Sequence, residues 1–171
     1  MARGWSDHGW RVYWAARLSG LRGSVEAMSR IQLTRAMLDE QLTAVGRDPY
    51  TGPDSAEGLR RACLDAVLAA YDLGAEPARP VVRGAVRFLL DRLVFRAPGK
   101  SVEVRIPPYA AVQCVDGPRH TRGTPPNLIE MDAATWVRLA AGRLAWADAV
   151  ADGRIRASGA RADLSGLLPL V

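Results

Sequence analysis

The segment from Pro118 to Asn127 holds the polar side chains that are best suited to binding chemistry. Arg119, His120 and Arg122 stand close together in it, and the planar guanidinium of arginine matches the oxygen atoms of a phosphate or carboxylate. We therefore expect these three residues to bind an anionic head group. The alternative is an ordinary surface loop, because all of the 23 basic residues except Lys100 are arginine.

Residues that carry catalytic or metal chemistry are sparse. The histidines are His8 and His120 and the cysteines are Cys63 and Cys114, all in separate segments. A zinc site would need these residues to converge without any closely spaced ligand pair. A Ser-His-Asp arrangement around His120 lacks the Gly-x-Ser-x-Gly turn, and no phosphate-binding glycine-rich loop occurs. We therefore predict that the protein is not an enzyme and has no catalytic residue, metal site or cofactor.

The composition is typical of a globular domain without a nucleic-acid partner. The chain has 171 residues, of which 49% are apolar, and a formal net charge of +5. Its arginines are scattered and do not form the basic stripe that nucleic-acid binding requires. No apolar run is long enough to cross a membrane, and no secretory signal is recognisable. We expect a cytoplasmic protein whose two cysteines are free thiols.

The first 27 residues contain Trp5, Trp10 and Trp14 together with several arginines. One interpretation is an interfacial helix that contacts a membrane surface peripherally, with arginine meeting the lipid phosphates. The other is a disordered leader, or a translation start assigned too early, with Met28 as the true first residue. We favour the second interpretation, because glycines interrupt any long helix in this segment.

Helical periodicity precedes and follows a group of strands. Apolar residues recur at helical spacing in three ranges: Ser29–Val45, Ser55–Leu73 and Pro80–Arg96. Gly46 and Gly74 are suited to end the first two helices, and Pro80 suits the first turn of the third. Two shorter helices are predicted on either side of Gly142, and Asp132 is predicted to be the N-cap of the first of them.

Four strands are predicted, within Ser101–Pro108, Tyr109–Gly117, Asn127–Asp132 and Arg154–Ser158. The second is more apolar than the first and is expected to be more central. Branched apolar residues alternate with charged ones, which predicts an antiparallel or mixed sheet with one face covered by helices and one face solvated. The charged face is expected to carry Glu103, Arg105, Glu130, Arg154 and Arg156.

The C-terminal part of the chain carries a family resemblance. It contains the runs NLIEMDAATWVRLAAGRL and AWADAVADGRI, followed by Ala-Ser-Gly and an apolar tail. This order of strand, helix, Gly-Arg-Leu turn, helix and Gly-Arg-Ile strand resembles the sterol carrier protein (type 2) superfamily. Residues 79–171 resemble more closely the bacterial sterol carrier orthologue family of actinobacteria.

The resemblance implies an α+β fold in which a sheet of four to five strands lies under helices. It also implies a non-catalytic carrier whose apolar tunnel accepts a fatty acid, an acyl-CoA or a sterol-like lipid. We expect residues 1–27 to be a leader, 28–78 a helical N-terminal extension and 79–171 the carrier domain. The expected tunnel walls are Phe88, Val104, Ile106, Val112, Trp136, Leu139, Trp146 and Val150. The expected lid consists of Leu164, Leu167 and Leu168 of the tail.

Two alternatives to a carrier remain open at this point. One is a structural or protein-interaction module whose core is filled by its own side chains. The other follows from the same resemblance, because this fold also occurs as the accessory domain of thiol-dependent isomerases, beside a helical bundle with three metal-binding histidines. Neither His8 nor His120 falls within the three predicted helices between Ser29 and Arg96, which argues against such a bundle.

Overall fold

A computed structural model describes residues 32–117 and 127–171, and the predictions made for residues 1–27 lie outside this described part. The region from Leu33 to Val171 is one compact unit. Its helices are α2 (Arg35–Ala44), α3 (Ala56–Asp72), α4 (Arg79–Arg96), α5 (Ala133–Ala140) and α6 (Trp146–Ala151). Its strands are β1 (Val102–Ile106), β2 (Ala110–Cys114), β3 (Leu128–Met131) and β4 (Ile155–Ser158), and a 3-10 turn, η1, covers Ser165–Leu167.

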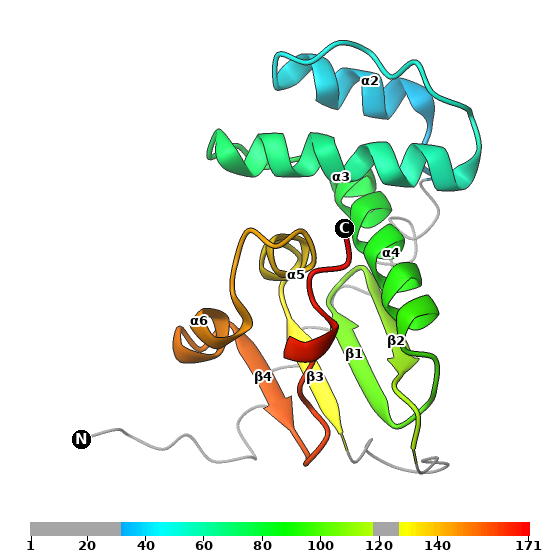
Figure 1. The fold of residues 1–171 in the computed structure, drawn as a ribbon. Coiled ribbons are helices and arrows are strands. Elements are labelled where there is room, and N and C mark those ends of the chain that lie inside the picture. The colour runs from blue at the N-terminus through cyan, green and yellow to red at the C-terminus, as the bar shows by residue number, and fades with distance from the viewer. Residues whose placement is uncertain (1–31, 118–126) are drawn as a thin grey trace, which may run out of the picture. The chain divides into compact units, whose positions relative to one another are not determined.

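The four described strands form one mixed sheet in the order β2-β1-β3-β4 (Figure 1). Strand β1 pairs with β2 antiparallel and with β3 parallel, and β3 pairs with β4 antiparallel. The predicted α+β architecture with a helical N-terminal part is therefore confirmed. The prediction that β2 is more central than β1 is wrong, because β2 lies at an edge. Its apolar content comes largely from Ala110 and Ala111, which gain little from burial.

The two faces of the sheet differ as the alternation predicted. In β1, the side chains of Val102, Val104 and Ile106 are buried, whereas those between them are partly exposed. On the solvated face, Arg105 Nε pairs with a carboxylate oxygen of Glu103, and an Arg156 nitrogen lies 3.9 Å from a Glu130 oxygen. These are surface ion pairs, which typically contribute less than about 1 kcal/mol.

The N-terminal helices begin and end at recognisable signals. Ser55 caps α3 by accepting a hydrogen bond from Gly58 N–H at 3.1 Å, and Gly74 follows the helix with φ = 69°. Helix α2 starts later than predicted, since Thr34 accepts the N–H of Met37 and is therefore the N-cap. Residue Gln32 is not helical, and the earlier part of that predicted helix lies outside the described residues.

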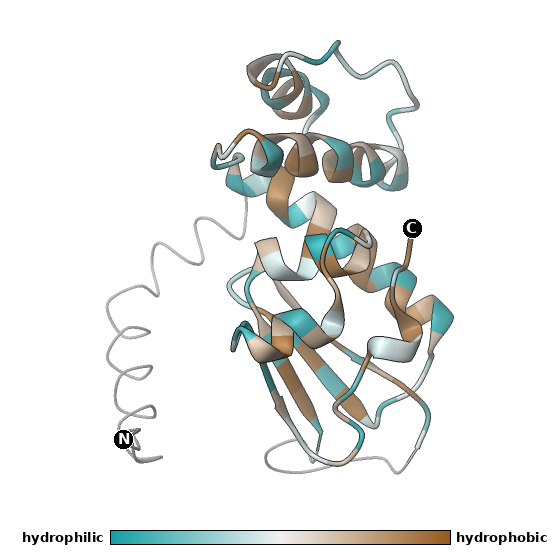
Figure 2. Ribbon diagram, turned by 60° about the vertical axis from the view of Figure 1, so that its left-hand side comes forward, coloured by the Kyte–Doolittle hydropathy of each residue, from teal (hydrophilic) through white to brown (hydrophobic). Residues whose placement is uncertain are grey.

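Helix α4 contacts both the N-terminal helices and the sheet. It runs from the stacked pair α2 and α3 toward β2 (Figure 1). Its packing against α3 is so close that a Cβ atom at Gly84 would lie 2.7 Å from Cys63 Sγ. Buried residues of α3, α4, α5 and the sheet belong to one continuous apolar core. In Figure 2, apolar residues (brown) recur along α4 and along the strands.

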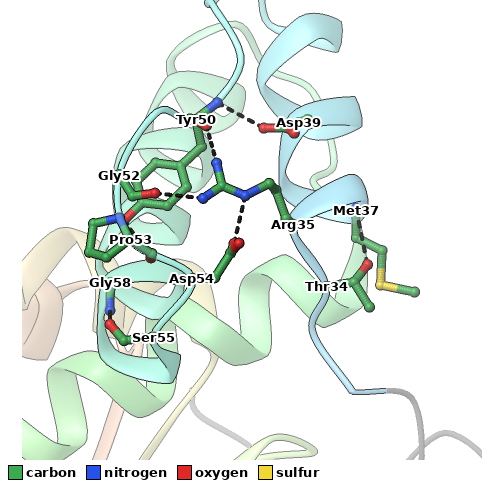
Figure 3. A network of polar contacts seen from close by, with 10 residues as sticks. All are labelled: Thr34, Arg35, Met37, Asp39, Tyr50, Gly52, Pro53, Asp54, Ser55 and Gly58. Carbon is green, nitrogen blue, oxygen red and sulfur yellow. Dashed lines mark hydrogen bonds and ion pairs between the residues drawn. The ribbon is translucent and has the colours of Figure 1, made fainter.

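A polar network centred on Arg35 fixes the connection between α2 and α3 (Figure 3). Its Nε donates to Asp54 Oδ1 at 2.6 Å, and its terminal nitrogens donate to the carbonyl oxygens of Tyr50 and Gly52. The guanidinium also lies over the Tyr50 ring, 5.0 Å from its centroid. Asp39 accepts the Tyr50 N–H at 2.8 Å, so both ends of the network are attached to α2.

Among the described residues, no helix is both long enough and apolar enough to cross a bilayer.

Candidate functional site

Six of the predicted wall and lid residues lie in the interior of the unit. Trp136, Val104, Ile106 and Leu164 are 0% exposed, Leu139 is 1% exposed and Phe88 is 7% exposed. All six belong to one apolar cluster. The structure thus brings together residues from α4, β1, α5 and the C-terminal tail that are far apart in the sequence.

A helix cap and the alternation of residues in a strand orient these side chains toward the same core. Asp132 caps α5, as predicted, by accepting the backbone N–H of Thr135 at 2.8 Å and its hydroxyl at 3.0 Å. The cap fixes the start of the helix, so Trp136 and Leu139, which are three positions apart, share its buried face. Period-two alternation in β1 turns Val104 and Ile106 toward the same core.

The remaining predicted wall and lid residues lie nearer the surface. Val112 of the edge strand and Trp146 of α6 are partly buried and pack against the core. Leu167 and Leu168 of the tail do the same. Val150 is 48% exposed and stands on the outer side of α6, whose buried residue is Ala149. Its position therefore gives no support for a role as a wall.

The indole nitrogen of Trp136 is the unusual atom of this core. Within the described part of the chain, Trp136 Nε1 is a buried side-chain nitrogen without any hydrogen-bond partner. Other buried polar side chains are satisfied: Gln41 accepts the Ala78 N–H at 2.6 Å, and Asn127 donates to the Ser101 carbonyl at 2.8 Å. An unsatisfied buried donor costs about 1–3 kcal/mol, so it calls for an explanation.

Two arginines of α4 hold the C-terminal tail in place. Arg92 Nε donates to the Leu170 carbonyl at 3.0 Å, and Arg96 donates to the carbonyls of Leu167 and Pro169. The Leu170 N–H in turn donates to the Ala140 carbonyl at the end of α5. Arg92 and Arg96 were not among the predicted site residues, although their i, i+4 spacing places them side by side on one helix face.

A second group of polar residues lies where α3, α5 and the β1–β2 turn approach one another. Burial raises the pKa of Tyr71 to about 12, with further contributions from Tyr109 and Asp132. Burial likewise raises the pKa of Tyr109, and Glu76 acts in the same direction. Arg138 lies over the Tyr71 ring, 5.5 Å from its centroid, and donates to the Tyr71 carbonyl at 3.4 Å. Both phenols are therefore neutral at physiological pH.

The two cysteines are free, buried thiols. Burial raises the pKa of Cys63 to about 12 and that of Cys114 to about 11. Neither is a thiolate at neutral pH, so neither resembles an activated nucleophile or a ready metal ligand. In residues 32–117 and 127–171, no group of three or more His, Cys, Asp or Glu residues is arranged to hold a metal ion.

A surface hollow of about 290 Å³ is lined by Leu42, Arg47, Asp48 and Asp65. It lies at the α2–α3 end of the unit and includes none of the predicted wall residues. The predicted anion-binding residues Arg119, His120 and Arg122 lie outside the described residues. Their role as a head-group site therefore stays a prediction.

The comparisons with known proteins agree with the geometry of the C-terminal part. A family model described as "Bacterial SCP ortholog", where SCP denotes sterol carrier protein, matches residues 78–170. The match begins at the N-cap of α4 and includes the sheet, α5, α6 and the tail. A comparison with curated proteins found no match. Because the family model covers more than half of the 171 residues, the chain belongs to the family of bacterial sterol carrier protein orthologues.

Proposed function

We propose that this protein is a non-catalytic carrier that binds an apolar or amphipathic lipid reversibly in the cytoplasm. Family membership favours a carrier role, because sterol carrier domains generally bind lipids without catalysis. The observation that carries the proposal is the family match over residues 78–170. We place the lipid in the apolar interior shared by β1, α5 and the tail, which includes Val104, Trp136 and Leu164. A lipid taken up among these side chains would gain about 0.8 kcal/mol for each methylene removed from water.

The C-terminal tail is the segment that we expect to admit the ligand. Leu164 is buried and Leu167 is partly buried against the core, so the tail covers apolar surface. Beyond the backbone bond from Leu170 to Ala140, the tail is held by the side chains of Arg92 and Arg96. Hydrogen bonds from side chains at the surface exchange readily with water, so they restrain the tail without fixing it permanently.

The second candidate is a structural or protein-interaction module. The near-complete burial of Val104, Ile106 and Leu139 favours it, because side chains that fill one another's space leave no room for a lipid. The two functions differ in whether the apolar interior can open to admit a lipid.

Binding is tested with the full-length chain. Native mass spectrometry of the purified protein would reveal a lipid that remains bound through purification. Titration with a fluorescent fatty acid and with an acyl-CoA is expected to saturate in the micromolar range. Saturable binding, competed by the matching unlabelled fatty acid, would support the carrier. Neither a bound lipid nor saturable binding would support the filled-core module.

The role of the tail is tested by removing the hydrogen bonds that Arg92 and Arg96 donate to it. In Arg92→Gln/Arg96→Gln, stopped-flow exchange of the fluorescent fatty acid should be about tenfold faster, because each lost charged hydrogen bond weakens the closed state. Arg87→Gln is the matched control, since Arg87 is exposed on the same helix. Equal exchange rates in all three proteins would contradict a gating tail while leaving the carrier function intact.

A further inference from the structure

Trp136 combines complete burial with an unsatisfied donor. Its side chain is 0% exposed, and its indole N–H has no acceptor in the described structure. The buried polar residues elsewhere show that the fold satisfies such groups when it can: Ser101 donates to the Val115 carbonyl at 2.9 Å, and Thr135 donates to Asp132 at 3.0 Å. The exception therefore points to an acceptor that the described residues do not supply.

The environment restricts what this acceptor is. Trp136 belongs to the buried apolar cluster, with Val104 and Leu139 as further fully buried members. A water molecule held there would need about two to four polar partners, and among the buried side chains of the described residues the Trp136 indole N–H is the group without a partner. A carboxylate would be buried without a counter-ion, which is costly. A single uncharged oxygen on an otherwise apolar molecule needs one donor only and brings no charge into the core.

We propose that the Trp136 indole N–H is the polar anchor of the ligand site. It donates a hydrogen bond to one neutral oxygen, a hydroxyl or carbonyl, of a lipid whose remainder lies among the apolar side chains. The site would then select long-chain alcohols and esters over free carboxylates and over molecules without an oxygen acceptor. This inference rests on the proposed carrier function and specifies its ligand class.

The test uses three probes of the same chain length: 1-decanol, decanoate and 1-chlorodecane, which is a poor acceptor. Binding to the full-length protein is measured at neutral pH by displacement of a fluorescent fatty alcohol, whose head group is a neutral oxygen. We expect 1-decanol to bind about tenfold more tightly than either other probe, since one net hydrogen bond corresponds to about that ratio. Trp136→Phe keeps an aromatic ring and removes the donor, so it should abolish most of this preference.

A spectroscopic measurement on the unmodified protein gives the same answer without any variant. The Trp136 Nε1–H resonance of the ¹⁵N-labelled chain should move downfield on saturation with 1-decanol and stay nearly unchanged with 1-chlorodecane. Trp146→Phe is the matched control for the binding measurements, because Trp146 is partly buried on α6, and it should retain the preference for the alcohol.

The possible outcomes separate the two proposals. Saturable binding of all three probes without a shift of the Trp136 resonance, or with equal affinities, would overturn the anchor and keep the carrier. Binding of none of the probes would overturn both. A preference for 1-decanol that persists unchanged in Trp136→Phe would also overturn the anchor, because another group would then hold the oxygen.

Discussion

The side-chain N–H groups of Arg35 and Trp136 differ in whether they have hydrogen-bond acceptors. At the α2–α3 connection, all three side-chain nitrogens of Arg35 donate to acceptors within the chain, as Figure 3 shows. In the core of the family-matched region, the one side-chain N–H of Trp136 donates to none in the described structure. Arg35 is partly exposed, so water could have served it, whereas Trp136 has no such access. The buried indole N–H, which water cannot reach, is thus the donor without an acceptor.

The contrast distinguishes a connection whose donors are all paired from a core in which one buried donor has no acceptor. The Arg35 network ties three points of an irregular connection to one helix, which leaves nothing for a ligand to add. The Trp136 core is buried and apolar, and the Trp136 indole N–H has no acceptor in the described structure. A ligand that supplies the missing acceptor would therefore stabilise the second region and leave the first unchanged.

Truncation of the core tryptophan should have the largest effect. Trp136→Ala is expected to lower the free energy of unfolding by about 3–5 kcal/mol, because it removes a fully buried ring and leaves a cavity. Urea unfolding followed by circular dichroism measures the loss. Phe95→Ala is the control, since Phe95 is 90% exposed and its loss should cost no more than about 0.5 kcal/mol. A loss below about 1 kcal/mol for Trp136→Ala would mean that the core already contains open space.

High pH should destabilise the core through its two buried thiols, Cys63 and Cys114. Burial raises the pKa of Cys63 to about 12 and of Cys114 to about 11. Unfolded thiols lose their protons near pH 8.5–9, so the stability that these groups provide is complete below that pH. It is lost as the pH rises toward 11–12. We expect the free energy of unfolding to fall by about 1 kcal/mol per pH unit for each thiol in this window.

Urea unfolding at a series of pH values between 8 and 11 measures this decline. Cys63→Ala/Cys114→Ala is the matched variant, because it removes both titrating groups from the core. Its stability should depend less steeply on pH over the same range. An identical slope in the two proteins would contradict the assignment of the alkaline transition to the thiols.

A hydrogen bond accepted by a buried side chain can be removed for comparison. Gln41 is buried and its Oε1 accepts the N–H of Ala78, the N-cap residue of α4, at 2.6 Å. Gln41→Leu keeps a side chain of similar volume and removes the acceptor, so it should cost about 1–3 kcal/mol. Gln113→Leu on the exposed side of β2 should change stability by less than about 0.5 kcal/mol. Equal losses in the two variants, measured by thermal unfolding, would show that the hydrogen bond from Ala78 to Gln41 contributes little to stability.

The sequence predicted the parts of the fold that depend on local patterns. The cap at Asp132, the stop at Gly74 and the alternation of β1 each follow from residues within a few positions of one another. The order of the strands depends instead on contacts between distant segments. The edge position of β2 was therefore missed, because two alanines make a strand apolar without requiring its burial.

The same distinction applies to the candidate site. Trp136 and Leu139 were predicted as walls of a tunnel, and both are buried, as large apolar side chains on one helix face normally are. The missing acceptor of Trp136 is not a property of any sequence pattern, because it depends on every atom that surrounds the indole in three dimensions. The contact between Arg96 and the tail also joins residues more than seventy positions apart. Neither feature was predictable from spacing alone.

Removal of the orphan donor should have the smallest effect on stability and is the most informative change. Trp136→Phe loses ring volume, which is destabilising, but it also removes a donor whose burial costs about 1–3 kcal/mol. We expect the two effects to offset each other to within about 1 kcal/mol, as measured by urea unfolding without ligand. If Trp136→Phe instead costs as much as Gln41→Leu or more, the indole N–H has an acceptor in solution. The contrast with Arg35 would then disappear, and with it the reason to expect a ligand oxygen at this position.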